Sequence, residues 1–151
     1  MPPPQVGALL RMAWESLHSE LVDGLVSAGF TDLRPPHRPL LRYVLTDGLR
    51  PGALAARLGI SKQAVNDLLR EFEANGYLVL EPDPADRRAK RIRLTERGWD
   101  LAITASNLSH AVAGRWAAHV GAERYAQFES VLRDIVEHES RAASRDKTAL
   151  P

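Results

Sequence analysis

The sequence predicts a mainly α-helical fold that carries one small β-hairpin. Along most of the 151 residues, apolar side chains recur at intervals of three and four, the spacing of a single buried helix face. Two short stretches differ. Residues 77–80 form an aromatic and aliphatic run, and residues 91–94 alternate basic and apolar side chains, as a half-buried strand does. A chain of this length is expected to fold around one core.

The segment PGALAARLGISKQAVNDLLR, residues 51–70, has the features of two short helices joined by a tight turn. Pro51 suits a first helical position, where a missing N–H costs no hydrogen bond. Gly59 suits the left-handed residue that ends a helix, and Ser61 can accept a hydrogen bond from the free N–H groups that begin the next one. The pattern predicts a helix-turn-helix, whose apolar contacts come from Leu54, Ala55, Leu58, Ile60, Val65 and Leu68.

The second of these helices has one apolar and one polar face. Val65, Leu69 and Phe72 fall on the apolar face. Asparagine and glutamine can pair with adenine, and arginine and lysine with guanine, so the polar face suits the major groove of DNA. A helix that only faces water would also be polar there, but the basic hairpin that follows favours DNA. The helix residues expected to contact DNA are Ser61, Lys62, Gln63, Asn66 and Arg70.

The stretches 77–80 and 91–94 flank a loop, 81–90, and together they predict a β-hairpin wing. The net charge of the whole chain is only +1, but five of the ten lysines and arginines between residues 50 and 98 lie within residues 87–93. Such a cluster suits phosphate groups, although solvated runs of charge are also common. We expect contacts to DNA from Arg87, Arg88 and Lys90.

Two helices are expected before this central part. The first covers residues 6–28, and its apolar surface is wider than one small neighbour would cover. The second covers about residues 36–46 and begins close to Pro39, because proline is tolerated only in the first turn of a helix. The apolar stripe of the first helix contains Leu10, Trp14, Leu17, Leu21 and Leu25.

Two further helices are expected after the hairpin. Thr95 suits the N-cap of a long helix that extends to about residue 118, and Gly121 separates it from a last helix over about residues 122–142. The apolar residues of the last helix are Tyr125, Phe128, Val131, Leu132, Ile135 and Val136.

The composition argues against several classes of protein. The chain has no cysteine, which excludes disulfides, thiolate metal sites and cysteine redox sensors. Its start, MPPPQVGALLRMAWE, lacks the basic and continuous apolar regions of a secretion signal, and no apolar run approaches the ~18 residues that span a bilayer. We expect a cytoplasmic protein with no membrane partner.

Enzymatic and metal-sensing functions find little support. There is no P-loop or dinucleotide-binding glycine motif, and Ser61 lacks a nucleophile-elbow motif. No two of the histidines have helical ligand spacing, and Glu137 and Glu139 point away from each other around His138 on a helix. We therefore expect no catalytic residue, no metal and no cofactor. The histidines are His18, His37, His110, His119 and His138.

The run LAARLGISKQAVNDLLREFEANGYLVLEPDPADRRAKRIRLTERG resembles the MarR (multiple antibiotic resistance regulator) family of winged helix-turn-helix transcriptional regulators. The matching pieces are the helix-turn-helix at residues 54–65, the Gly76-Tyr77 exit from its second helix, the hairpin string at residues 83–88 and the segment 94–98. The order of the flanking helices also fits.

The resemblance implies a homodimer in which the terminal helices of both protomers interleave. The implied segments are an N-terminal dimerisation helix over 6–32, a winged helix-turn-helix domain over 33–98, C-terminal dimerisation helices over 99–142, and flexible tails at 1–5 and 143–151. The residues expected in the dimer contact are Leu10, Leu17, Leu21, Leu132 and Ile135.

The resemblance also implies a repressor that binds a pseudo-palindromic operator and is released by a small, often aromatic or phenolic, molecule. Asp86 would stabilise the wing while Arg88 enters the minor groove; the alternative is a surface ion pair of little consequence. Ligand-pocket residues would include Trp14, His18, His37 and Leu41.

Two other functions remain open at this point. The winged helix could bind another protein, although the polar face of residues 61–70 shows no exposed apolar anchor. It could also be an architectural DNA-binding module, with little sequence preference and no ligand control.

Overall fold

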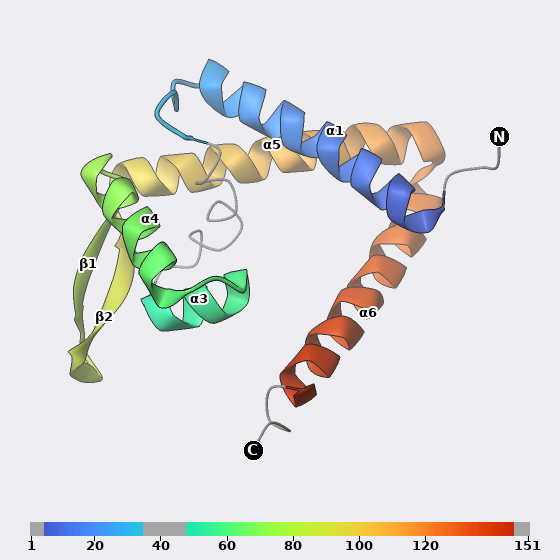
Figure 1. Cartoon of the computed structure of the whole chain (residues 1–151). Coiled ribbons are helices and arrows are strands. Elements are labelled where there is room, and N and C mark those ends of the chain that lie inside the picture. The colour runs from blue at the N-terminus through green and yellow to red at the C-terminus, as the bar shows by residue number, and fades with distance from the viewer. Residues whose placement is uncertain (1–4, 35–47, 147–151) are drawn as a thin grey trace. The chain divides into compact units, whose positions relative to one another are not determined.

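The computed structural model describes residues 5–34 and 48–146 of the chain. Its elements are the helices α1 (Val6–Ser27), α3 (Pro51–Leu58) and α4 (Lys62–Ala74), the strands β1 (Leu78–Asp83) and β2 (Asp86–Leu94), and the helices α5 (Glu96–Val120) and α6 (Ala122–Asp146) (Figure 1). The predicted mainly α fold with one hairpin is confirmed. The predicted helix over 36–46, with His37 and Leu41, lies outside the described residues. Contacts divide the chain into two compact units, residues 1–109 and 110–151.

The helix-turn-helix is held by local hydrogen bonds at the positions that the sequence predicts. Pro51 is the first residue of α3, and Gly59 ends this helix in the left-handed conformation, with a φ of 67°. The Ser61 hydroxyl accepts a hydrogen bond from the Ala64 N–H over 3.1 Å and so caps α4. The turn therefore depends on a residue that tolerates a positive φ at position 59.

The core of the first unit forms where α4 packs against α3, the hairpin and parts of α1 and α5. Val65, Leu69 and Phe72 of α4 are fully buried, and burying such a side chain contributes roughly 1.5–3 kcal/mol. This packing fixes the direction in which the opposite, exposed face of α4 points. The buried cluster contains Leu25, Leu54, Ala55, Val65, Leu69, Phe72, Tyr77, Leu78, Ile92, Leu94, Leu101 and Ala105.

The hairpin is longer than predicted. β1 and β2 pair in antiparallel register as far as Asp83 and Asp86, so most of the predicted loop over 81–90 is strand. Pro82 is tolerated because, in the part of the chain that the structure describes, no strand pairs with the outer edge of β1. The Leu80 N–H, on the same edge as the Pro82 nitrogen, donates to the Glu73 carboxylate over 3.0 Å instead.

The other edge of β2 is bonded to the segment before α3. The Gly48 N–H donates to the Ile92 carbonyl over 2.8 Å, and the Ile92 N–H donates to the Leu49 carbonyl over 2.9 Å. These bonds hold Arg50, the next residue along the chain, beside the hairpin.

The start of α5 is attached to the end of α4. Thr95 Oγ1 accepts a hydrogen bond from the Gly98 N–H over 3.1 Å and donates to the Gly76 carbonyl, so Thr95 is the predicted N-cap. The Thr95 N–H donates to the Tyr77 carbonyl over 3.1 Å. A Cβ at Gly98 would lie 1.9 Å from that carbonyl oxygen, so only glycine permits this close approach.

Tyr77 joins three segments through its side chain. Its buried ring lies 5.3 Å from the Phe72 ring and 6.2 Å from the Phe30 ring, between centroids. Its hydroxyl donates to Asp32, and Arg97 donates to the Tyr77 oxygen over 3.1 Å and to Asp32 over 2.9 Å. Burial, with the hydrogen bond to Asp32, raises the pKa of Tyr77 above its ordinary value.

In the second unit, α6 extends to Asp146, so residues 143–146, which were expected to belong to a flexible tail, are helical. Gly121, with a φ of 95°, separates α5 from α6 as predicted. None of the described helices is long and apolar enough to cross a membrane.

We expect Gly98→Ala to lower the free energy of unfolding by about 2–3 kcal/mol, because its methyl group would overlap the Tyr77 carbonyl and the chain would have to shift. Gly114→Ala in the same helix is the matched control. A Cβ there meets no atom within 4 Å, and alanine favours a helix interior by about 1 kcal/mol. Urea unfolding of both variants measures the difference, and equal stabilities would contradict the close approach.

We expect the free energy of unfolding to fall as the pH rises above about 10, because the raised pKa keeps Tyr77 neutral in the folded chain while the unfolded chain loses the proton. The stabilisation is complete below the unfolded pKa and is lost as the pH approaches the folded pKa. Tyr77→Phe should lack this part of the decline. Urea unfolding from about pH 8 to about pH 11 tests it; identical slopes for both proteins would refute the assignment.

Candidate nucleic-acid interface

The exposed face of α4, together with its exposed N-cap Ser61, carries every polar residue that the sequence assigns to DNA on this helix. Lys62, Gln63, Asn66 and Arg70 are exposed, and Val65 and Leu69, between them along the chain, are buried. Arg70 Nη1 lies 3.2 Å from Asp67 Oδ1, but both side chains are more than half exposed, so this ion pair holds Arg70 only weakly. The face can therefore rearrange its side chains against another molecule.

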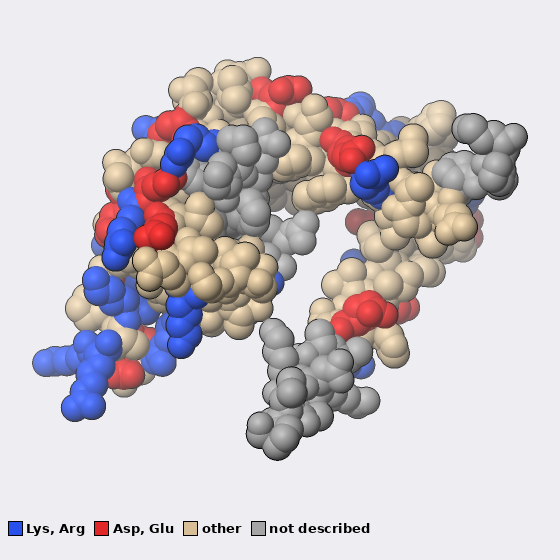
Figure 2. Space-filling model, viewed as in Figure 1, with Lys and Arg blue, Asp and Glu red and all other residues tan. Residues whose placement is uncertain are grey.

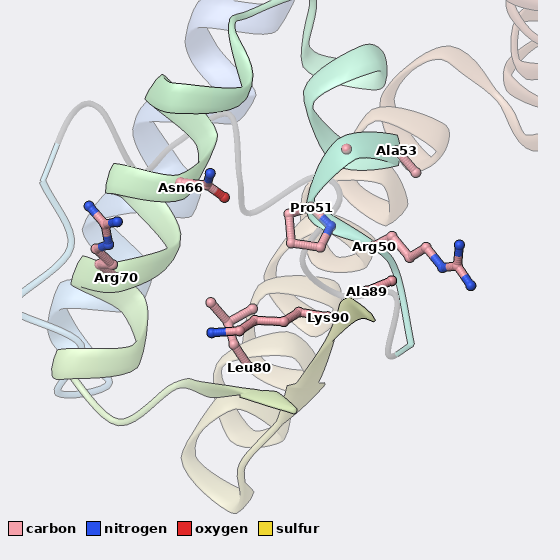
Figure 3. A pocket seen from close by; sticks show the side chains of 9 residues that line it. Arg50, Pro51, Ala53, Asn66, Arg70, Leu80, Ala89 and Lys90 are labelled. Atoms are coloured by element: carbon pink, nitrogen blue, oxygen red, sulfur yellow. The ribbon is translucent and has the colours of Figure 1, made fainter. Parts of the chain in front are cut away.

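This face borders an open cavity between α4, the start of α3 and the hairpin, with a volume of about 520 Å³. In Figure 3 the Asn66 amide points from α4 towards α3, and Lys90 extends from β2 towards Leu80. Arg50, Asn66, Arg70 and Lys90 are the residues of its lining that bear cationic or amide groups, and the Arg50 guanidinium extends away from the other lining side chains in Figure 3. The full lining is Arg50, Pro51, Gly52, Ala53, Asn66, Arg70, Leu80, Ala89 and Lys90.

Arg50 was not among the residues predicted to contact DNA. Its Nε donates to Asp83 Oδ2 over 2.6 Å, a contact across 33 residues of chain that no local pattern could reveal. The Ala85 N–H also donates to Asp83, over 2.8 Å. The hydrogen bond from the Ala85 backbone lowers the pKa of Asp83 most, and the hydrogen bond from Arg50 lowers it further. The Asp83 carboxylate therefore stays charged and connects the start of α3 to the hairpin tip.

The predicted wing residues Arg87, Arg88 and Lys90 are exposed on β2. Lys and Arg atoms gather at the tip of the hairpin in Figure 2. Asp86 Oδ1 accepts a hydrogen bond from the Arg88 N–H over 3.1 Å, which holds the backbone of the tip. Thus Asp86 contacts the backbone of Arg88 and leaves its guanidinium group exposed.

Two of the five basic residues within 87–93 are engaged elsewhere. Arg91 and Arg93 both donate to the Glu81 carboxylate of β1. The basic cluster expected from the sequence is therefore divided into an exposed part at the tip and a paired part nearer the core.

The residues expected to line a ligand pocket are only partly described. The rings of Trp14 and His18 are stacked on α1, with centroids 5.3 Å apart and planes 13° apart. They line a second cavity of about 280 Å³, together with Glu15, Ser19, Val22 and Asp23 of the same helix. His37 and Leu41 lie outside the described residues.

The residues expected at the dimer contact fall into two groups. Leu10 of α1 and Ile135 of α6 are 44% and 52% exposed, as expected for apolar side chains whose partner is another molecule. Leu17 and Leu132 are half-buried. Leu21, in contrast, packs against the intramolecular core. A charge at Leu21 would therefore disturb the fold itself.

Within the described ranges, 5–34 and 48–146, no three histidine, aspartate or glutamate side chains are grouped as a metal site requires.

Comparison with known proteins gives consistent matches. The sequence profile of the MarR family matches residues 31–89. The transcriptional activatory protein BadR of Rhodopseudomonas palustris is 31% identical over 65 residues, which cover 41% of this chain and 37% of BadR. The match thus spans little more than a third of that relative.

Solved structures match over most of the chain. CouR of Rhodococcus jostii, bound to p-coumaroyl-CoA, is 27% identical, with a TM-score of 0.67 and a match covering 87% of this chain and 91% of CouR. CouR bound to a 23-mer DNA duplex has the same TM-score, 0.67, at 21% identity over 87% of this chain and 92% of CouR, which is a likeness of fold. Together with the helix-turn-helix, the hairpin and the order of the flanking helices, these matches show that the chain is similar to the MarR family of winged helix-turn-helix transcriptional regulators, whose sequence profile covers its residues 31–89.

Proposed function

We propose that this protein is a sequence-specific DNA-binding regulator, which acts as a homodimer and represses transcription by occupying a pseudo-palindromic operator. One observation supports this above all: the polar face of α4 and the cationic side of the hairpin meet at a single open cavity, lined by Arg50, Asn66, Arg70 and Lys90. Apolar anchors of the kind that dock proteins are absent from the exposed positions of α4.

In the proposed complex, α4 lies in the major groove. The Asn66 amide suits adenine, and the Arg70 guanidinium suits guanine. Ser61, Lys62 and Gln63 are at the N-terminal end of the helix, where a recognition helix commonly meets base edges and phosphates. Lys90 and Arg87 contact phosphates, and Arg88 enters the minor groove at the hairpin tip.

The exposed apolar faces of the outer helices support the proposed dimer. Val131, Ile135 and Val136 on α6 are each more than half exposed, as is Val6 on α1. A two-fold dimer would place two recognition helices about 10 bp apart, in successive major grooves, and so would require a pseudo-palindrome. The DNA complex of CouR supports duplex DNA as the partner.

For the effector we propose a small aromatic or phenolic molecule. The stacked Trp14 and His18 rings border a cavity on α1, and CouR binds the phenolic thioester p-coumaroyl-CoA. Such a molecule would release the operator only if it binds more tightly to a dimer whose recognition helices no longer match the operator spacing. We assign the protein no catalytic role and place it in the cytoplasm with its operator.

The decisive experiment is selection of bound fragments from a genomic library with the full chain, at near-physiological salt. Recovery of one pseudo-palindrome supports the proposal. Recovery of unrelated fragments would favour an architectural module, and recovery of none would favour a protein-binding winged helix. The position of the recovered site relative to a promoter separates repression from activation, the role named for BadR.

We expect Arg88→Ala to weaken operator binding by about tenfold and to reduce the dependence of log affinity on log salt by about 1 per wing, because the cation that enters the minor groove and displaces counterions there is lost. Asn66→Ala should instead reduce the free energy of operator binding by about 1–3 kcal/mol and weaken the preference for adenine at one base pair per half-site. Arg141→Ala on α6, whose partner is Glu137 of the same helix, is the control. Fluorescence anisotropy measures all three, and an unchanged affinity for Arg88→Ala would remove the wing from the interface.

We expect the double change Val131→Asp and Ile135→Asp to yield monomers, because both side chains are more than half exposed and contribute little to the fold of one chain. Operator affinity should fall with the loss of the second half-site. Sedimentation equilibrium gives the mass, and circular dichroism reports whether the helices persist. The exposed polar pair Arg133→Asp and Glu137→Ala on the same helix should remain dimeric; a stable dimer in both double variants would exclude this face of α6 from the contact.

A further inference from the structure

The two faces of the hairpin differ in how their basic side chains are paired. Side chains alternate between faces along a strand. Ile92 and Leu94 of β2 are buried, so Arg91 and Arg93 point to the opposite, outer face. Lys90 shares the side of Ile92 and lines the cavity beside α4. The hairpin thus has a cationic side that faces the recognition helix and a second pair of arginines that faces away from it.

Glu81 occupies the centre of this outer face. It is the cross-strand partner of Arg91, and Arg93 is its diagonal neighbour. Its Oε1 accepts hydrogen bonds from Arg91 Nε and Nη2, over 2.9 and 2.6 Å, and its Oε2 accepts one from Arg93 Nε over 2.9 Å. These hydrogen bonds lower the pKa of Glu81, and the bond from Arg91 has the larger effect. The Glu81 carboxylate therefore remains charged at neutral pH.

The side chains at the hairpin tip contrast with this arrangement. Among the described residues, the side chains of Arg87, Arg88 and Lys90 form no ion pair, whereas one carboxylate engages both guanidinium groups of the outer face. Both arginines remain partly accessible, with side chains 35% and 56% exposed. Without Glu81 they would lose both of their hydrogen-bonded ion pairs, and the charge of Asp83, which acts on Arg91, would offset only part of theirs. They would then form a sequence-independent site for phosphate groups.

We propose that Glu81 is a specificity-determining residue, which neutralises the two arginines of the outer face and so confines the DNA-binding charge of the wing to its tip and to the side that faces α4. This inference rests on the proposed function. In the proposed complex Arg91 and Arg93 point away from the duplex that holds α4, because they lie on the face opposite Lys90 and Ile92. Charge released there would therefore strengthen binding to any duplex more than binding to the operator. Because a genome offers vastly more non-specific sites than operators, suppressing such binding determines occupancy of the operator.

The size of the effect follows from counterion release. Each additional phosphate contact makes the slope of log affinity against log salt more negative by about 0.9. At 0.1 M salt this corresponds to about eightfold tighter binding than without the contact. For Glu81→Gln we expect at least about fivefold tighter binding to a scrambled duplex and a steeper salt slope. Operator affinity should rise less, so the ratio of operator to scrambled affinity should fall.

The experiment titrates full-length protein with the selected operator and with a scrambled duplex of equal length and composition, over a range of salt. Glu137→Gln is the matched control, since it removes the same charge from an exposed carboxylate that is paired with Arg141 on α6. It should leave the affinity ratio unchanged. Circular dichroism and urea unfolding establish that each variant is folded.

A second variant, Arg91→Gln with Arg93→Gln, separates specificity from hairpin stability. The inference predicts unchanged operator affinity and an unchanged salt slope, because neither arginine contacts the operator. Adding both changes to Glu81→Gln should restore the wild-type affinity for the scrambled duplex. If Glu81→Gln fails to fold, the arginine variant still decides: a loss of operator affinity by a folded Arg91→Gln, Arg93→Gln protein overturns the inference.

The proposed function and this inference fail differently. Wild-type protein that binds the operator and the scrambled duplex equally refutes sequence-specific regulation, and protein that binds neither refutes both. Wild-type protein that prefers the operator, with a Glu81→Gln variant of unchanged preference and slope, refutes the role of Glu81 alone.

Discussion

Tyr77 is held at once by its ring, its hydroxyl and its carbonyl, and the arrangement of the first unit depends on this residue. The ring packs on Phe72 at the end of α4, the hydroxyl is bonded to Asp32 and Arg97, and the carbonyl receives the Thr95 N–H next to Gly98. A buried hydroxyl without partners would cost several kcal/mol, so the segment after α1 and the first turn of α5 must both stay in place. The orientation of α4 relative to the hairpin is a consequence of these contacts.

Charge is distributed unevenly over a chain that is nearly neutral as a whole. With twenty basic and nineteen acidic residues, its electrostatic field depends on which charges are paired locally. Asp83 holds Arg50 and Glu81 holds Arg91 and Arg93, while the hairpin tip and the exposed face of α4 keep exposed cations. A concentrated patch on a neutral background steers an anionic partner towards one orientation without attracting polyanions to the entire surface.

Features that depend on neighbouring residues were predictable from the sequence, and those that depend on distant residues were not. Pro51, Gly59, Ser61 and Thr95 act within one turn of helix, so their roles and the helix ends beside them were predicted correctly. The strands were predicted too short because Glu81 and Pro82 resemble loop residues until the partner strand is known. Arg50 was missed as a lining residue of the cavity for the same reason. Helix α6 continues past residue 142 because no glycine or proline follows there to stop it.

The hydrogen bond from Leu80 to Glu73 has a consequence for how copies of this chain meet one another. An open strand edge offers unpaired N–H groups on which a strand of another molecule can add, and that addition is the first step towards cross-β aggregates. On the outer edge of β1, the Leu80 N–H is already bound by Glu73 and Pro82 has no N–H to offer. The hairpin can therefore project its basic tip from the body of the protein without becoming a template for self-assembly, even at the high local concentration of protomers that a shared DNA molecule creates.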